Sequence, residues 1–180
     1  HPLLKLVPEE QALVQRVRQL VADHIGPNAA KVAETDDFAW DTFHLLGREG
    51  VIASAFPREY GGTAASMLAR VRIIEELGSV CTTAASLITG TDLSSRPIVA
   101  GGSAALKDAL LPDLAAGRTQ SAFALTEPGA GSDVARLACH YTDAPDGGVL
   151  ITGQKKFITR ASTADVFVAV ARRQGGPEGA

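Results

Sequence analysis

The sequence contains few of the features that mark membrane, metal-binding or nucleic-acid-binding proteins. Its two cysteines, Cys81 and Cys139, are far apart and belong to no CxxC or Cys/His cluster, so neither a zinc site nor a disulfide framework is indicated. The 17 Lys and Arg residues form no basic run and are outnumbered by 20 Asp and Glu residues, which excludes the charge pattern of a nucleic-acid-binding protein. No apolar stretch approaches the ~20 residues of a membrane helix, and no signal peptide is visible. We expect a cytoplasmic protein with no membrane span and no bound metal.

The residues that are present predict a folded chain whose first two thirds are helical. Hydrophobic residues make up 46% of the 180 positions, enough for a sizeable core. Apolar residues recur every three or four positions after Pro8, and Gly26-Pro27 is expected to end this first helix. Further helices are expected from the Asp36-Asp37 pair to an end between Gly47 and Gly50, over 68–77 with Gly78 as a breaker, and over 81–94. A last helix is expected from a Ser103 cap to Gly117, with a kink or a split at Pro112.

From about residue 119 the pattern changes to short strands rich in β-branched and aromatic residues. Strands are expected over 121–126, around Tyr141, and over 149–152, 155–159 and 166–171. Helices followed by strands predict an α+β fold, with a helical domain over 1–118 and part of an antiparallel β-domain over 119–180. Because so small a sheet with open edges seldom stands alone, we expect the sequence to stop inside this second domain.

The best candidate for a ligand-binding segment is the loop Thr126-Glu-Pro-Gly-Ala-Gly-Ser-Asp133, which follows a predicted strand. Its glycines let backbone N–H groups approach a ligand, and its hydroxyls can donate or accept hydrogen bonds. Val134 stands where the dinucleotide fingerprint and the nucleophile elbow both need glycine, and no Lys-Ser or Lys-Thr pair of a P-loop follows. From the residues alone, the loop is either an ordinary turn or a site for a planar, partly anionic ligand such as a reduced flavin.

Several strings in the expected order resemble the acyl-CoA dehydrogenase family. Phe123 to Asp133 is similar to the family signature, and Gly153-Gln-Lys-Lys-Phe-Ile-Thr159 is similar to its second flavin segment. Phe56-Pro-Arg-Glu-Tyr-Gly-Gly62 resembles the loop that precedes the third long helix of the family. The resemblance covers essentially the whole sequence. It implies a helical N-terminal domain and part of the middle β-domain, without the C-terminal helical domain that supplies the catalytic glutamate of the family.

The resemblance also implies specific roles for residues of this sequence. Phe123, Leu125 and Thr126 would approach the isoalloxazine ring of FAD, and Gly131 and Ser132 would extend that contact. Phe157, Ile158 and Thr159 would form a second flavin wall, while Ser132 would also meet the acyl-CoA substrate. A helix rich in small residues would line the acyl cavity through Ala85, Ser86, Thr89, Gly90 and Leu93.

Two departures from the family and one absence are visible. Arg160 replaces a usual Asn and could stabilise the reduced flavin, pair with a CoA phosphate or point to solvent, and Phe157 stands where many members have Trp. No residue can be assigned as the catalytic base, and Glu75, Glu76 and Glu127 are interpreted as charges on helix surfaces or turns.

The resemblance implies an enzyme of fatty acid metabolism that dehydrogenates an acyl-CoA thioester between its α and β carbons, with hydride transfer to flavin N5. Its full-length form would be a homodimer or homotetramer that passes electrons to an electron-transfer flavoprotein or a similar acceptor. The portion given by this sequence would be inactive alone. Two alternatives remain. One is a related flavoprotein, such as an acyl-CoA oxidase, a nitroalkane oxidase or a flavin monooxygenase, and the other is a non-catalytic partner subunit.

Overall fold

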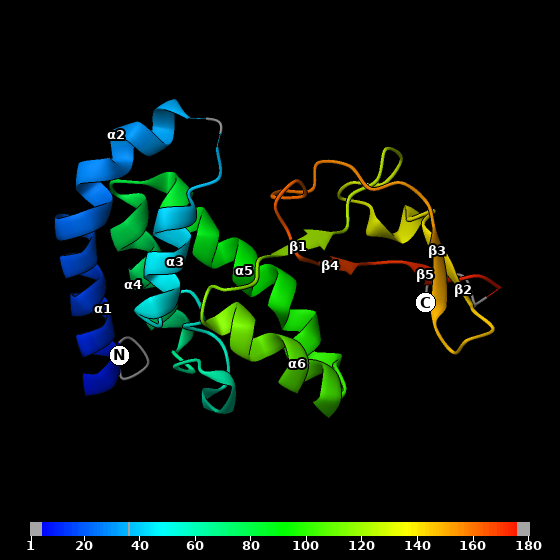
Figure 1. Cartoon of the computed structure of the whole chain (residues 1–180), viewed down its shortest axis with the longest axis horizontal. Helices are drawn as coiled ribbons and strands as arrows, with labels where there is room; N and C mark the ends of the chain where they lie inside the picture. The colour runs from blue at the N-terminus through cyan, green and yellow to red at the C-terminus, as the bar shows by residue number, and fades with distance from the viewer. Residues whose placement is uncertain (1–4, 36, 176–180) are drawn as a thin grey trace.

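The computed structural model describes residues 5–35 and 37–175, which form a helical region followed by a region of short strands (Figure 1). The helices are α1 (Pro8–Leu20), α2 (Gly26–Glu34), α3 (Trp40–Arg48), α4 (Met67–Gly78), α5 (Thr82–Gly101) and α6 (Ala104–Ala115). The strands are β1 (Ser121–Ala124), β2 (His140–Asp143), β3 (Val149–Thr152), β4 (Val166–Ala169) and β5 (Arg172–Arg173). Short turns η2 (Val21–Ile25), η3 (Arg58–Tyr60) and η4 (Val134–Arg136) complete the elements. Among the described helices, none is both long and apolar enough to cross a membrane.

One hydrophobic core holds the helical region together. The expected stripe on the first helix is confirmed, because Leu13, Val14, Val17, Leu20 and Ile25 are all buried. On α4 the buried residues are Ala69, Ile73 and Leu77, whereas Val71 is exposed. The expected ends are found, since α4 ends at Gly78 and the Ser103 hydroxyl caps α6 by accepting the Leu106 N–H at 3.2 Å.

The chain stays helical at two prolines where the sequence allowed the helix to end or split. The chain does not leave the helix at Gly26-Pro27, because η2 is a π-helical turn that leads directly into α2. Pro27 then lies in the first turn of α2, where its missing N–H costs little. Pro112 does not split α6, because Leu111 and Leu114 on either side of it are fully buried and hold the helix in place. The third helix begins at Trp40, after the expected Asp37; Asp36 lies outside the described residues.

The strand region is only partly antiparallel. β2 and β3 form the expected antiparallel hairpin, with Asp143 opposite Val149. β1 pairs with β4 in parallel, from Ser121 opposite Val166 to Ala124 opposite Ala169, and β5 pairs with β2 in parallel. The parallel pairing of β1 and β4 is possible because the whole hairpin lies between them in the chain and provides the crossover.

The predicted strand over 155–159 is a loop. Phe157 and Arg160 have left-handed backbone angles, with φ of 57° and 67°, which a strand cannot accommodate. Residues 125 and 126 also fall outside β1. These differences place most of both family segments on loops, one after β1 and the other after β3.

Helix α5 joins the two regions. It contacts α3, α4 and α6 on the helical side and β1 and β4 on the strand side (Figure 1). The hydroxyls of Ser94 and Ser121, both fully buried, are 2.6 Å apart and tie α5 to the start of β1. Next to Ser121, the backbone N–H of Gln120 donates to the Asp165 carboxylate at 2.8 Å. The position of β1 and of the loops around it is therefore set by α5.

Candidate functional site

The two segments singled out in the sequence lie side by side. The Lys156 N–H donates to the Thr126 carbonyl at 2.8 Å, and Lys155 Nζ donates to the Leu125 carbonyl at 3.0 Å. These bonds join positions 30 residues apart in the chain, so they fix the loop after β1 against the loop after β3. The loop at 126–133 and the loop at 155–160 consequently form one continuous wall.

Glu127 is the anchor of this wall, not the turn charge that the sequence predicted. Its side chain is only 6% exposed, and its Oε1 atom is 2.8 Å from Lys155 Nζ. The carboxylate also accepts the N–H groups of Ala138 at 2.6 Å and Cys139 at 3.0 Å. Because a buried carboxylate is stable only when its oxygens are satisfied, these donors explain its position. Glu127 thus binds three separate stretches of chain together.

The electrostatics of the anchor favour the charged form. Burial alone would raise the pKa of Glu127, but the hydrogen bonds from Lys155, Ala138 and Cys139 and the positive charge of Lys155 outweigh it and hold the pKa below its ordinary value of 4.5. The carboxylate is therefore ionised at neutral pH and fully occupied by its donors. The sequence offered one signal for this pair, namely opposite charges in the two family segments, but their distance along the chain hid the contact.

The predicted flavin residues are arranged along the wall with different exposures. Phe157 is 79% exposed, with Lys156 Nζ 4.4 Å from the centre of its ring. Thr159, Gly131 and Ser132 are also exposed, and a β-carbon added at Gly131 would meet no atom within 4 Å. Phe123, Leu125, Thr126 and Ile158 are half-buried. The two loops therefore carry an aromatic ring and hydroxyl groups at exposed positions.

The predicted acyl-cavity residues lie on α5 and are divided between its faces. Ser86, Thr89 and Leu93 are exposed at helical spacing, and Gly90 beside them is half-buried. Ala85 is 8% exposed and lies in the helical core. The Arg160 side chain comes from the loop at 155–160 and packs directly over Gly90. The α5 stripe and the 155–160 loop therefore meet at Arg160.

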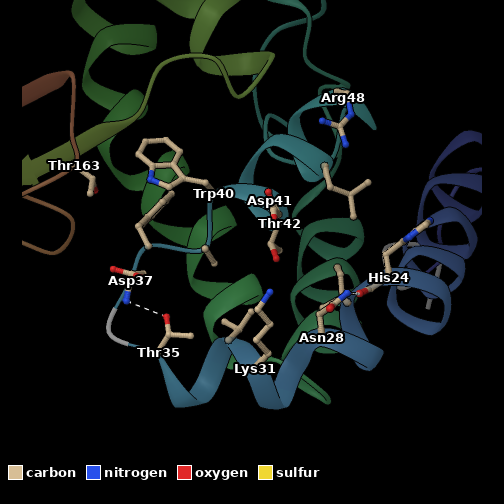
Figure 2. Close-up of a pocket in the computed structure, with 15 residues that line it drawn as sticks. His24, Asn28, Lys31, Thr35, Asp37, Trp40, Asp41, Thr42, Arg48 and Thr163 are labelled. Carbon is tan, nitrogen blue, oxygen red and sulfur yellow. Dashed lines mark hydrogen bonds between the residues drawn. The ribbon is translucent and has the colours of Figure 1, made fainter.

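A separate hollow of about 720 Å³ lies between α2 and the segment that leads into α3 (Figure 2). Trp40 and Asp41 line it from α3, Asn28 and Lys31 line it from α2, and Thr163 reaches it from the strand region. Its lining includes none of the predicted site residues. The sequence gave no signal for it, because its lining residues are scattered and mixed in charge.

Comparison with known proteins identifies the family of the chain. Family models described as the N-terminal and the middle domain of acyl-CoA dehydrogenase match residues 7–118 and 122–180. The chain is 35% identical over 164 residues to the cyclohex-1-ene-1-carbonyl-CoA dehydrogenase of Syntrophus aciditrophicus strain SB. This match covers 91% of the chain and 39% of that relative.

Two solved structures of glutaryl-CoA dehydrogenase from Mycobacterium smegmatis are similar in fold. One has a TM-score of 0.85 and 33% identity, over 93% of this chain and 43% of that chain. The other, in complex with FADH2, has a TM-score of 0.86 and 26% identity, over 95% of this chain and 44% of that chain. The chain thus spans less than half the length of these similar proteins. The chain belongs to the acyl-CoA dehydrogenase family, and its sequence matches the N-terminal and middle domains of that family.

Proposed function

We propose that this chain is part of an FAD-dependent enzyme that dehydrogenates an acyl-CoA thioester between its α and β carbons. The observation that carries the proposal is the wall in which Thr126 and Lys156 are hydrogen-bonded and Glu127 is paired with Lys155. By the complete enzyme we mean residues 1–180 together with the segment that corresponds to the remaining length of the relatives.

The wall fits one side of a flavin. An exposed Phe157 ring can stack on a planar ring system, and the exposed loop at Gly131 and Ser132 leaves backbone N–H groups open to polar ring atoms. When bound, FAD supplies the oxidant that takes up the two electrons removed from the substrate. Phe123, Leu125, Thr126, Gly131, Ser132, Phe157, Ile158 and Thr159 are the residues that would hold it.

The α5 stripe would form the substrate side of the site. Ser86, Thr89, Gly90 and Leu93 present small or exposed side chains next to the flavin wall, and Ser132 would contact the acyl-CoA. We assign no catalytic base to this chain. Glu127 is committed to Lys155 and two amides, so it does not abstract the α-proton.

The proposed partners follow from the same reaction. The substrate is an acyl-CoA, and the reduced flavin passes its electrons to an electron-transfer flavoprotein or a similar acceptor. The complete enzyme is proposed to be a cytoplasmic homodimer or homotetramer.

The isolated 180-residue chain should bind FAD weakly and should not catalyse the reaction. The wall described above contacts one side of a flavin, so much of the binding free energy of the complete pocket is lacking. Adding acyl-CoA to the chain mixed with FAD should leave the flavin absorbance unbleached under anaerobic conditions. The complete enzyme, measured in parallel, should bleach. Rapid turnover by the 180-residue chain alone would contradict the proposal.

Enlarging position 89 should shorten the acyl chains that the complete enzyme accepts. Thr89 is exposed on the stripe of α5, so a Phe side chain there would project into the proposed cavity. We expect Thr89→Phe to reduce kcat/KM for long acyl-CoA thioesters by about tenfold to a hundredfold relative to short ones. Thr89→Val, which keeps the volume, should retain the chain-length profile. An identical profile in both variants would place the acyl group elsewhere.

A further inference from the structure

A positively charged side chain lies without an ionic partner where α5 meets the loop after Thr159. Among the described residues, no carboxylate pairs with Arg160, and the nearby Asp92 is already engaged by Arg70 and Arg96. The guanidinium Nη1 has only a long bond to the Thr91 hydroxyl, at 3.4 Å. Its Nε atom is buried and has no hydrogen-bond partner in the described part of the chain. Burial lowers the pKa of Arg160, but a guanidinium remains charged in proteins.

The space that Arg160 occupies is created by Gly90. A β-carbon at position 90 would overlap Nη2 of Arg160 and would lie 2.7 Å from its Cζ atom. The Nη2 end of the guanidinium therefore packs closely against α5 at Gly90, within the stripe that contains Thr89 and Leu93. Any larger residue at position 90 would displace it from this place.

The backbone of Arg160 is also unusual for its residue type. Its φ of 67° lies in the left-handed region, which asparagine tolerates far better than arginine because its short side chain can hydrogen-bond locally. This chain thus keeps both a strained backbone and an uncompensated charge at one position, a combination that points to function.

We propose that Arg160 binds a carboxylate at the far end of the acyl group, so that the preferred substrate is the mono-CoA thioester of a dicarboxylic acid. This inference rests on the proposed function, because it places the acyl group along α5 beside the flavin wall. A carboxylate matches the planar fork of a guanidinium with two parallel hydrogen bonds. An uncharged alkyl end would instead shield the cation from water and leave it unpaired, which opposes binding.

The test compares thioesters that differ only in the terminal group. The flavin-loaded complete enzyme is assayed anaerobically with adipoyl-CoA and hexanoyl-CoA, and with the shorter pair glutaryl-CoA and pentanoyl-CoA. Affinity is measured separately by calorimetry with the 3-thia analogues of each pair, which cannot be dehydrogenated. We expect the unmodified enzyme to favour a dicarboxylic thioester over its uncharged counterpart by at least about tenfold in kcat/KM and in affinity.

Substitution should remove this preference selectively. Arg160→Gln should lose at least about tenfold with the dicarboxylic thioesters and should keep or improve its activity with the uncharged ones. Arg160→Lys keeps the positive charge but loses the paired donors of the guanidinium. Its activity with the dicarboxylic thioesters should lie between those of the unmodified enzyme and Arg160→Gln. Arg58→Gln removes a guanidinium exposed on the surface and should change the activity with neither the dicarboxylic nor the uncharged thioesters.

Three results would overturn the inference: a preference of the unmodified enzyme for the uncharged thioesters, equal losses with both classes in Arg160→Gln, or a loss of FAD affinity with unchanged discrimination. If no thioester reduces the flavin, the proposed function fails. The affinities for the analogues then still decide the role of Arg160, because they do not depend on turnover.

Discussion

Replacing Glu127 by Gln is expected to destabilise the strand region by about 3 kcal/mol, the usual effect of breaking a buried ion pair. Glutamine has nearly the same shape, but it leaves the buried Lys155 ammonium without its counter-charge. It also weakens the acceptor for the amides of Ala138 and Cys139. The change is measured by urea denaturation and by hydrogen exchange at these two amides, which should lose protection.

A surface ion pair provides the control for this prediction. Glu9 pairs with Arg58 at 2.8 Å, but both side chains are mostly exposed, so Glu9→Gln should change the free energy of unfolding by less than about 1 kcal/mol. If Glu127→Gln unfolded at the same urea concentration as the unmodified chain, the wall would not depend on this anchor.

The contribution of Glu127 should also depend on pH in a definite direction. Its pKa is lower in the folded chain than its ordinary value of 4.5, so the unfolded chain binds the proton more readily. The stabilisation is therefore fully present above the ordinary value and is lost as the pH falls through the folded value. The difference in unfolding free energy between the unmodified chain and Glu127→Gln should shrink over the same range, and a constant difference would rule out this assignment.

Substitution of Gly47 by Ala is expected to destabilise the helical region by about 2–3 kcal/mol, as overpacking does in close-packed interiors. A β-carbon at position 47 of α3 would overlap the carbonyl oxygen of Ala116 and lie 2.8 Å from the Cα atom of Gly117. Both obstacles are backbone atoms at the end of α6, so no side-chain rotation relieves the overlap. Urea denaturation followed by helical circular dichroism measures the loss.

Gly101 is the matched control for Gly47. It is the last residue of α5, and an added β-carbon there would meet no atom within 4 Å. Gly101→Ala should leave the stability unchanged or raise it by up to about 1 kcal/mol, as expected from helix propensity. Equal stability of the two variants would show that α3 and α6 can separate without cost.

Local signals in the sequence were sufficient for several elements of the fold. Ser103 and Gly78 mark a helix start and a helix end through chemistry that involves only their near neighbours, and both expectations are confirmed. The stripe on α1 is confirmed for the same reason, because periodicity reports directly which face is buried.

Features that depend on distant contacts could not be predicted from the sequence. Residues 155–159 have the composition of a strand, but the positive φ of Phe157 turns them into a loop. Glu127 looks like a charge in a turn until its partner Lys155, 28 residues away, is placed beside it. The resemblance to the family indicated which two segments to consider together, whereas the bonds that join them became visible only in three dimensions.

The central position of α5 has a consequence for how such a protein can change over evolution. One side of this helix packs into the helical core through residues such as Leu87 and Ile88, whereas Thr89 is exposed and Gly90 is covered by the Arg160 side chain. A mutation that shifts the helix from the core side therefore also shifts the opposite side. Substitutions that change the stability of α5 would therefore also move the residues that we propose to face the acyl group, so the two properties could not change independently.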